Sequence, residues 1–449
     1  MDFINFTFGK TPVIVITVTS AGTEGEKMAQ STIAIIILVT ALVLYSIPKV
    51  PLSVTTVFAM LAMAMTGILT YAQAFSGFAN SAVLLVAGMM IIGRACFTSG
   101  LAQRFGNLLY KYVGTNEKHF MIMVFLVSTL LAVFLNGALV VAMMIPIIDS
   151  VASQSEGRIS RKQIYFPLGV ASCIGNNLTT ISATSMITAA GLVAAAGYGE
   201  ISLFAPTLVN LPALIVVIIV YILFIYRAQQ KWFDFEEIPL PGSHAEQREA
   251  KSDPLKMWIT GIVLIAVVTA LVIGMNYGAV ALLGSSILIL TGCVGERDAF
   301  QSVSWSSVII VAGALGFSQG LDTSGAGVLI ANFIIHLFGP LGHSPFGLCI
   351  VLLFLGSLMS NLMSDSASVA ILIPITLSMS ETLGCDPLPL VLACASGIKV
   401  AVATPLSKAP MTMIQIPGYR FTDYLKEGGL VNIVSITVTA VAIWIVYYL

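Results

Sequence analysis

The stretch that decides the fold is LMSDSASVAILIPI, which runs from Leu362 to Ile375. It places a short polar group inside a long apolar run and closes with a proline, Pro374. A similar stretch, LNGALVVAMMIPI, lies at 135–147 and has Asn136 in the position of Ser364. Paired interruptions at corresponding places in two halves of a membrane protein are the best sequence indication of a transporter's binding site. The pair therefore predicts a secondary transporter.

The composition indicates a membrane protein. Of the 449 residues, 57% are hydrophobic and only 9% are charged, whereas soluble domains carry about 25% charged residues. Apolar runs close to the roughly 20 residues that cross a bilayer as a helix recur from Ser31 to Leu449. The sequence therefore predicts an all-α polytopic membrane protein, and we expect it to be a multi-pass protein of the cell (inner) membrane.

The predicted spans fall into two halves. Residues 1–30 contain no run of spanning length, so we expect a lead-in outside the membrane. Residues 101–112 have one apolar face, which suits a helix lying in the interface. The predicted spans are 31–47, 52–70, 80–97 and 203–226 in the first half, and 255–273, 280–294, 303–321 and 430–449 in the second.

Each half also contains two interrupted segments. Residues 120–149 and 346–379 carry the polar groups quoted above, which predicts two re-entrant hairpins. The segments after them, 164–195 and 388–416, are broken near the middle by small or polar residues. Each half is therefore expected to have five transmembrane helices and one hairpin, with broken helices at the site.

The two halves repeat each other. The hydrophilic residues 227–254 form a linker between a first repeat at 31–226 and a second at 255–449. Four groups recur at an offset of 225, among them Thr66-Gly67 as Thr291-Gly292. This register predicts an internal duplication. Because five crossings are an odd number, we expect the second repeat to be inverted relative to the first.

Basic residues orient this topology. With the predicted spans, 17 of the 20 Lys and Arg residues, Lys408 included, lie on one side of the membrane. That side is predicted to be the cytoplasm, so the linker is cytoplasmic. Lys399 and Asp365 are then the only ionisable residues expected near mid-depth, where such residues are functional by default.

The candidate site lies at the two hairpin tips and the two helix breaks. Unpaired backbone groups at membrane depth are tolerated only inside protein or around a watery cavity. The N-termini of half-helices suit an anion, and their exposed carbonyl groups suit a cation. The predicted substrate-binding residues are Asn136, Gly137, Asn177, Thr179, Ser364, Asp365, Ser366, Lys399, Thr404 and Ser407.

Other interpretations of these residues stay open. Small polar residues also let helices approach closely, and Asp365 with Lys399 could form an ion pair that only holds the hairpin against a helix. Asp365 could equally carry a proton. Enzymatic activity has little support, since the four histidines and six cysteines show no metal-ligand spacing. The sequence has no GxxxxGK[ST] phosphate loop and no basic surface for nucleic acid.

These motifs resemble the divalent anion:sodium symporter family of the ion transporter superfamily. The resemblance rests on the hairpin endings AMMIPI and AILIPI, on the Gly-broken helix that follows, and on VATPLS at Val402–Ser407. It implies a homodimeric elevator carrier in contact with membrane lipid, which moves dicarboxylates, citrate or sulfate by sodium coupling or by exchange. It also implies a possible sodium ion, for which the matching residues are Asn136, Gly175, Asn176, Asp365 and Ala403.

The chain departs from the family pattern at both tips. The family carries Ser-Asn-Thr there, whereas this chain has Asn136-Gly137-Ala138 at the first tip and Ser364-Asp365-Ser366 at the second. Lys399 could therefore supply a fixed positive charge where a relative binds sodium. The alternative function is a cation/proton antiporter of the same superfamily, with Asp365 as the exchanging carboxylate. No other cofactor is expected.

Overall fold

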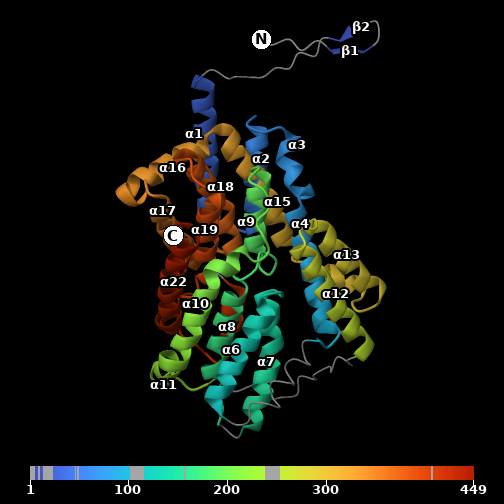
Figure 1. Cartoon of the computed structure of the whole chain (residues 1–449), viewed down its shortest axis with the longest axis vertical. Coiled ribbons are helices and arrows are strands. Elements are labelled where there is room, and N and C mark those ends of the chain that lie inside the picture. The colour runs from blue at the N-terminus through green and yellow to red at the C-terminus, as the bar shows by residue number, and fades with distance from the viewer. Residues whose placement is uncertain are drawn as a thin grey trace.

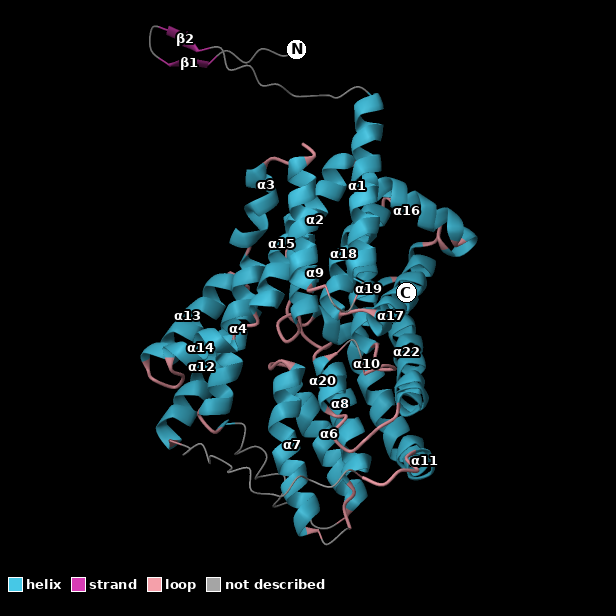
Figure 2. Cartoon of the chain, turned by 180° about the vertical axis from the view of Figure 1, so that it is seen from behind, coloured by secondary structure: helices cyan, strands magenta, loops and turns pink. Residues whose placement is uncertain are grey.

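The computed structural model describes residues 6–8, 11–13, 24–45, 47, 50–101, 116–155, 158–237, 253–405 and 408–449. Helices make up most of this part of the chain (Figures 1 and 2). The sheet within these residues is a short antiparallel pair, β1 (Phe6–Phe8) and β2 (Thr11–Val13). The predicted helical class is confirmed.

The helices of the first half follow the predicted order. They are α1 (Glu24–Tyr45), α2 (Leu52–Met65), α3 (Tyr71–Phe75), a 3-10 turn (Ser76–Ala79), α4 (Ser81–Thr98), α6 (Glu117–Ala132), α7 (Gly137–Gln154), α8 (Arg161–Gly175), α9 (Thr184–Ala195), α10 (Ala205–Val220), a π-helical turn (Tyr221–Ile225) and α11 (Tyr226–Trp232). The interruptions predicted at Asn136 and at 175–177 separate α6 from α7 and α8 from α9. Of the predicted interface helix, only Leu101 lies within the described residues.

The second half repeats this order and adds helices that the prediction lacked. It comprises α12 (Pro254–Val272), α13 (Tyr277–Leu290), α14 (Glu296–Ser302), α15 (Trp305–Ser324), α16 (Ala326–Leu337), a 3-10 turn (Gly339–Leu341), α17 (Pro345–Leu362), α18 (Asp365–Leu383), α19 (Pro387–Val400), α20 (Ala409–Met413), α21 (Phe421–Asp423), a π-helical turn (Tyr424–Gly428) and α22 (Gly429–Tyr447). Helices α14 and α16 are additions to the predicted spans.

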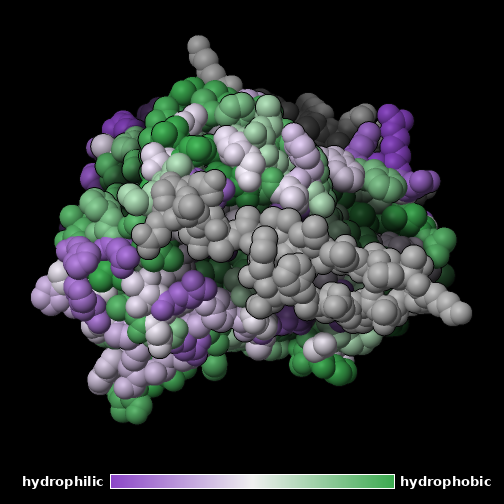
Figure 3. Space-filling view, turned by 90° about the horizontal axis from the view of Figure 1, so that it is seen from above, coloured by the Kyte–Doolittle hydropathy of each residue, from purple (hydrophilic) through white to green (hydrophobic). Residues whose placement is uncertain are grey.

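Seven helices in the described part of the chain are long and apolar enough to cross a membrane, or eight if the bent pair α14–α15 is one span. Their outer faces expose large apolar side chains such as Leu223, Ile262 and Ile433. Figure 3, which looks onto one end of the molecule, shows broad hydrophobic areas beside the hydrophilic ones. Exposed apolar area of this extent suits contact with lipid. The chain is a multi-pass membrane protein, as predicted.

Local residue chemistry sets the ends of these helices. The recurring Thr-Gly groups end two helices, because Gly67 and Gly292 follow α2 and α13 with positive φ values of 77° and 68°. Glycine takes this left-handed conformation without a Cβ clash and so ends helices efficiently. At the hairpin tips, Asn136 Oδ1 accepts from Ala138 N–H at 3.0 Å, and Ser364 Oγ accepts from Ala367 N–H at 3.2 Å. The polar groups that marked the tips therefore cap α7 and α18.

Helices of each half pack against a helix of the other half. Helices α1 and α2 lie against α15 of the second half, whereas α12 and α13 lie against α4 of the first (Figure 1). Each hairpin instead packs on the helix that follows it, so α6 and α7 contact α8, and α17 and α18 contact α19. We call α1, α2, α4, α12, α13 and α15 the framework helices, and α6–α10 with α17–α22 the hairpin body.

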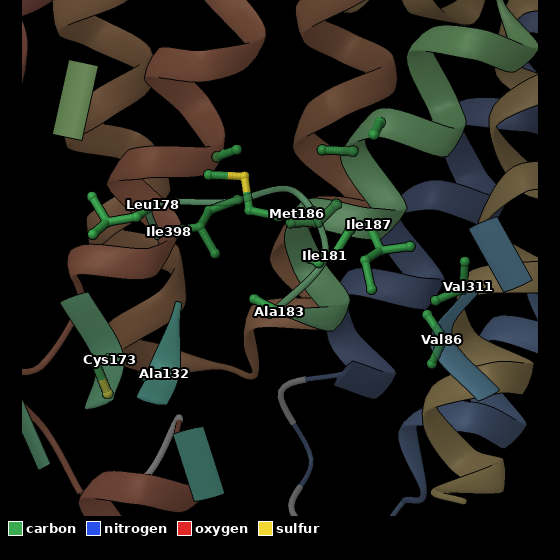
Figure 4. Close-up of a cluster of buried hydrophobic side chains, with 14 of the residues drawn as sticks. Val86, Ala132, Cys173, Leu178, Ile181, Ala183, Met186, Ile187, Val311 and Ile398 are labelled. Atoms are coloured by element: carbon green, nitrogen blue, oxygen red, sulfur yellow. The ribbon is translucent and has the colours of Figure 1, made fainter. Parts of the chain in front are cut away.

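The break between α8 and α9 lies inside the hydrophobic core. Leu178, Ile181 and Ala183 of the break pack with residues of α8, α9 and α19 (Figure 4). Each of these three side chains is buried. Because water is scarce around this backbone, its polar groups need partners in the protein.

A buried carboxylate joins the two π-helical turns. Glu427, in the turn before α22, accepts hydrogen bonds from Tyr221 Oη at 2.8 Å and from Gln229 Nε2 at 2.9 and 3.0 Å. Tyr221 begins the π-helical turn after α10, and Gln229 lies in α11. The end of the first half is thereby bonded to the start of the last helix.

Candidate functional site

Both hairpin tips and both helix breaks meet at one cavity of about 310 Å³. Asn136 lies at the first tip and Ser364, Asp365 and Ser366 at the second, so the structure brings together residues more than 200 positions apart. The breaks contribute Cys173, Asn176, Ala183, Thr184, Ser185, Lys399, Lys408, Ala409 and Pro410. The framework contributes Leu52, Ser304, Ser306, Ser307 and Ile310.

Asp365 is the centre of the charged part of the cavity. Its Oδ1 accepts from Ser360 Oγ at 2.6 Å and from Lys408 Nζ at 2.8 Å. Its Oδ2 accepts from Lys399 Nζ and from Lys408 Nζ, both at 3.0 Å. Three ionisable groups thus share one buried cluster, with two lysines to one aspartate, and its net charge is +1 when all three are ionised.

The structure corrects the predicted position of Lys408. The count of basic residues assigned it to the cytoplasmic side, but its side chain is only 2% exposed and lies in the core. Its Nζ also donates to the carbonyl oxygen of Ile398, in the last turn of α19, at 2.8 Å. The prediction was wrong because the chain turns back after α19, so Lys408 stands at the helix break. Lys399 and Asp365 are therefore not the only buried ionisable residues.

Several predicted substrate residues make structural hydrogen bonds away from the cavity lining. Asn177 Nδ2 donates to Asn210 Oδ1 at 2.9 Å, and both side chains are buried. A Cβ on Gly137 would lie 2.9 Å from the side-chain amide group of Asn176, so this glycine lets the tip approach the break. Ser407 lies outside the described residues. Of the ten predicted residues, Asn136, Ser364, Asp365, Ser366 and Lys399 line the cavity.

The residues predicted for sodium also hold the tips in place. With its amide oriented to satisfy both groups, Asn176 donates to the carbonyl oxygens of Ala132 and Leu135 and accepts from Gly137 N–H at 2.8 Å. Gly175 packs α8 on α6, since a Cβ there would lie 2.6 Å from the carbonyl oxygen of Thr129. In the second half, Ala403 N–H donates to Asn361 Oδ1 at 3.1 Å.

Two threonines bond the breaks to the hairpins in the same way. Thr179 Oγ1 donates to the carbonyl oxygen of Val133 at 2.6 Å, just after α6. Thr404 Oγ1 donates to the carbonyl oxygen of Asn361 at 2.8 Å, at the end of α17. The two threonines are 225 positions apart (404 − 179), which is the offset of the recurring sequence groups. In each half, a threonine at the helix break therefore donates a hydrogen bond to the hairpin before it.

We expect Thr404→Val to lower the melting temperature of the protein and to reduce the uptake of substrate into proteoliposomes several-fold. The change keeps the side-chain shape but leaves the Asn361 carbonyl without this donor, and an unmet buried acceptor costs about 1–3 kcal/mol. Thr437→Val is the matched control, since Thr437 Oγ1 bonds within its own exposed helix turn, to Ile433 O at 2.8 Å. Equal melting temperatures for the two variants would contradict a role of Thr404 in holding the tip.

A group of serine and threonine residues that line the cavity was not predicted from the sequence. Thr184 and Ser185 begin α9, and Ser304, Ser306 and Ser307 lie at the start of α15. Ser304 Oγ accepts from Ser307 N–H at 3.4 Å and so caps α15. The SVSWSS sequence before an apolar run is a recognisable helix start. This sequence could have predicted the N-terminus of a helix here, but it does not indicate that the helix faces the hairpin tips.

A multi-pass helical protein whose hairpins and broken helices surround a charged cavity is characteristic of secondary transporters. The sequence profile of the citrate transporter family matches residues 34–397, which is most of the chain. The chain therefore belongs to this family, and the resemblance predicted from the hairpin motifs is confirmed.

Curated relatives match over shorter stretches. The uncharacterized transporter YfbS of Escherichia coli is 28% identical over 152 residues, which cover 34% of this chain and 25% of that protein. Human solute carrier family 13 member 4 is 28% identical over 148 residues, which cover 33% of this chain and 23% of that protein. Sodium/sulfate cotransporter 2 of Chlamydomonas reinhardtii is 28% identical over 138 residues, which cover 31% of this chain and 16% of that protein. The matched stretches thus span a quarter or less of these three relatives.

The fold has a solved counterpart. The YdaH transporter of Alcanivorax borkumensis superposes with a TM-score of 0.60, covering 93% of this chain and 98% of that one at 17% identity. At this identity the likeness shows the fold alone.

Proposed function

We propose that this transporter carries small anions of the dicarboxylate, citrate or sulfate class across the cell membrane. The observation that supports this most is the pair of buried ammonium groups, Lys399 and Lys408, which line the cavity with a single carboxylate between them. Burying an unbalanced positive charge is costly. A bound anion would offset that cost, whereas a cationic substrate would increase it.

We further propose that fixed ammonium groups replace a coupling cation at the second break. Lys408 Nζ contacts both Asp365 oxygens and the Ile398 carbonyl oxygen. Carbonyl oxygens at the ends of broken helices are the groups that coordinate sodium in such carriers. One relative is named a sodium/sulfate cotransporter, but in this chain a lysine already bonds these oxygens. The sodium ion predicted at the first break, near Asn136 and Gly175, stays a prediction.

The proposed movement is an elevator. The cavity has the hairpin body on one side and Leu52, Ser304 and Ile310 of the framework on the other. A substrate at this boundary would cross the membrane if the hairpin body slid along the framework. We propose that the framework also holds a homodimer, and that residues 31–226 and 255–449 are inverted repeats joined by a cytoplasmic linker at 227–254. The 225-residue offset between Thr179 and Thr404 supports the repeats.

The second candidate is the cation/proton antiporter. An exchanging carboxylate must become free to bind its ion, but both oxygens of Asp365 accept from ammonium groups, and Ser360 adds a third donor. This arrangement favours Asp365 as a fixed counter-ion of the two lysines.

Uptake into proteoliposomes separates the two functions. We expect radiolabelled succinate, citrate or sulfate to accumulate above protein-free vesicles, and to do so in potassium as well as in sodium buffer. Accumulation that requires sodium in the wild type and also in Lys408→Met would show that sodium couples transport elsewhere than at Lys408, as at the first break, while accumulation that becomes sodium-dependent only in Lys408→Met would support the replacement. Proton release on adding sodium or lithium, together with no uptake of any anion, would establish the antiporter instead.

A further inference from the structure

Two histidine side chains meet at the corner where α16 leads into α17, at one side of the molecule (Figures 1 and 2). His336 lies in the last turn of α16, and His343 follows the 3-10 turn Gly339–Leu341. Their ring centroids are 5.7 Å apart, with an angle of 70° between the ring planes. Both residues are exposed, so a solute can reach both rings.

The separation of the rings suits a shared metal ion. A zinc ion binds imidazole nitrogen at about 2.0–2.1 Å with tetrahedral angles, which places the centroids of two bound rings about 5–6 Å apart. The observed 5.7 Å lies within this range. Exposed side chains change rotamer within nanoseconds, so both rings can direct a nitrogen at one point without a change in the backbone.

The hydrogen bond of His343 leaves its other nitrogen available to a metal. Its Nδ1 lies 2.9 Å from the carbonyl oxygen of Gly339. A carbonyl oxygen can only accept, so Nδ1 carries the hydrogen and the neutral ring has its lone pair on Nε2. Metal-binding histidines almost always donate their other N–H to a carbonyl or carboxylate oxygen, which orients the ring and makes it a stronger ligand.

The backbone of the corner also favours a bound cation. His336 lies at the C-terminus of a 12-residue helix, where the helix dipole amounts to about half a negative unit charge. A Cβ on Gly342 would lie 2.2 Å from the carbonyl oxygen of Ile335, so the chain folds back tightly against the last turn of α16. The two histidines are therefore held near each other before a metal arrives, which lowers the entropy lost on binding.

We propose that His336 and His343 together bind one divalent transition-metal ion of the zinc or copper class. Imidazole suits Zn²⁺, Cu²⁺ and Ni²⁺, whereas Mg²⁺ and Ca²⁺ prefer oxygen ligands. Within the described residues, no group of three or more His, Cys, Asp or Glu side chains could hold a metal. Water therefore completes the coordination, and the ion exchanges readily. This inference does not depend on the proposed substrate.

The place of the pair in the fold gives the bound ion a structural consequence. Helix α16 connects α15 of the framework to α17 of the hairpin body, and it packs against α18. An ion held by both histidines cross-links the end of α16 to the residue just before α17. The corner through which the framework is joined to the second hairpin is then fixed by the metal.

Zinc titration of the purified full-length protein tests the site. Equilibrium dialysis against Zn²⁺, after removal of metals with EDTA, gives the affinity and the number of ions bound by the wild type, His336→Ala and His343→Asn. The asparagine keeps an N–H donor for the Gly339 carbonyl group but has no nitrogen lone pair to offer a metal. His119→Ala is the matched control, since His119 is an exposed histidine of a different helix, α6.

We expect the wild type and His119→Ala to bind one Zn²⁺ ion that His336→Ala and His343→Asn bind at least about tenfold more weakly. Hydrogen-bond partners of metal ligands alone change metal affinity about 10–100-fold, so the loss of a ligand should have at least this effect. Cu²⁺ should bind more tightly than Ni²⁺ or Zn²⁺, and Mg²⁺ should not compete.

Three results would overturn the site. The first is a wild type that binds no Zn²⁺, and the second is equal Zn²⁺ binding by the wild type and both variants of the pair. The third is a loss of binding in only one of these two variants, because the ion would then not be shared between His336 and His343.

Discussion

Replacing Lys408 with methionine is expected to lower anion uptake at least 100-fold and to destabilise the protein. The ammonium group holds both oxygens of Asp365 and the carbonyl oxygen of Ile398. Without it the cluster falls from a net charge of +1 to zero, so an anion loses its electrostatic attraction. Breaking a buried ion pair typically costs about 3–5 kcal/mol. Uptake by proteoliposomes at equal protein density, with the melting temperature of the same preparations, measures both effects.

A double variant tests whether charge is the cause. Lys408→Met combined with Asp365→Asn leaves Lys399 as the one ion of the cluster and restores the net charge to +1. We expect this pair to recover part of the uptake that Lys408→Met loses. Lys426→Met is the control, because Lys426 is exposed. Wild-type uptake by Lys408→Met, or a double variant no better than the single one, would show that the charge of the cluster is not needed.

Gly397→Ala is expected to destabilise the fold strongly. A Cβ at Gly397 would lie 2.2 Å from the carbonyl oxygen of Leu353 and 2.9 Å from its Cα, so α17 and α19 touch backbone to backbone. The obstacle is main chain and cannot rotate away. Forcing atoms into a packed core usually costs about 1–3 kcal/mol, and we expect the upper end of that range or more.

Gly429→Ala is the matched control for this substitution. Gly429 is helical as well, and among the described residues no atom outside its own helix lies within 4 Å of an added Cβ. The yield of monodisperse protein in gel filtration and the melting temperature should fall sharply for Gly397→Ala and stay near wild type for Gly429→Ala. Similar values for the two would disprove the close contact of α17 with α19.

The hairpin tips and helix breaks could be predicted because their signal is local. Asn136 and Ser364 are polar residues within apolar runs, and the same property makes them helix caps in the structure. The recurring Thr-Gly groups are local too, since a glycine with positive φ ends a helix whatever surrounds it.

The position of Lys408 could not be predicted in this way. Counting basic residues treats any lysine near the end of a span as cytoplasmic, which is sound on average. Its partner Asp365 is 43 positions away (408 − 365), and only the packing of α18 against α19 brings the two together. For the same reason, the serines of α15 show a helix start in the sequence but not which cavity they face.

Helix α16 could have been predicted from the sequence but was not. The offset of 225 carries the predicted interface helix at 101–112 onto 326–337, which are the bounds of α16. Applying the repeat to each predicted element, and not only to matching letters, would have found it.

The hydrogen bonds of Glu427 bear on how the carrier can deform. Glu427 precedes α22 and accepts hydrogen bonds from residues that follow α10, so it links the two halves of the hairpin body away from the cavity lining. In the proposed elevator movement these hydrogen bonds would oppose shear between the two halves, and we expect the hairpin body to move as one rigid unit.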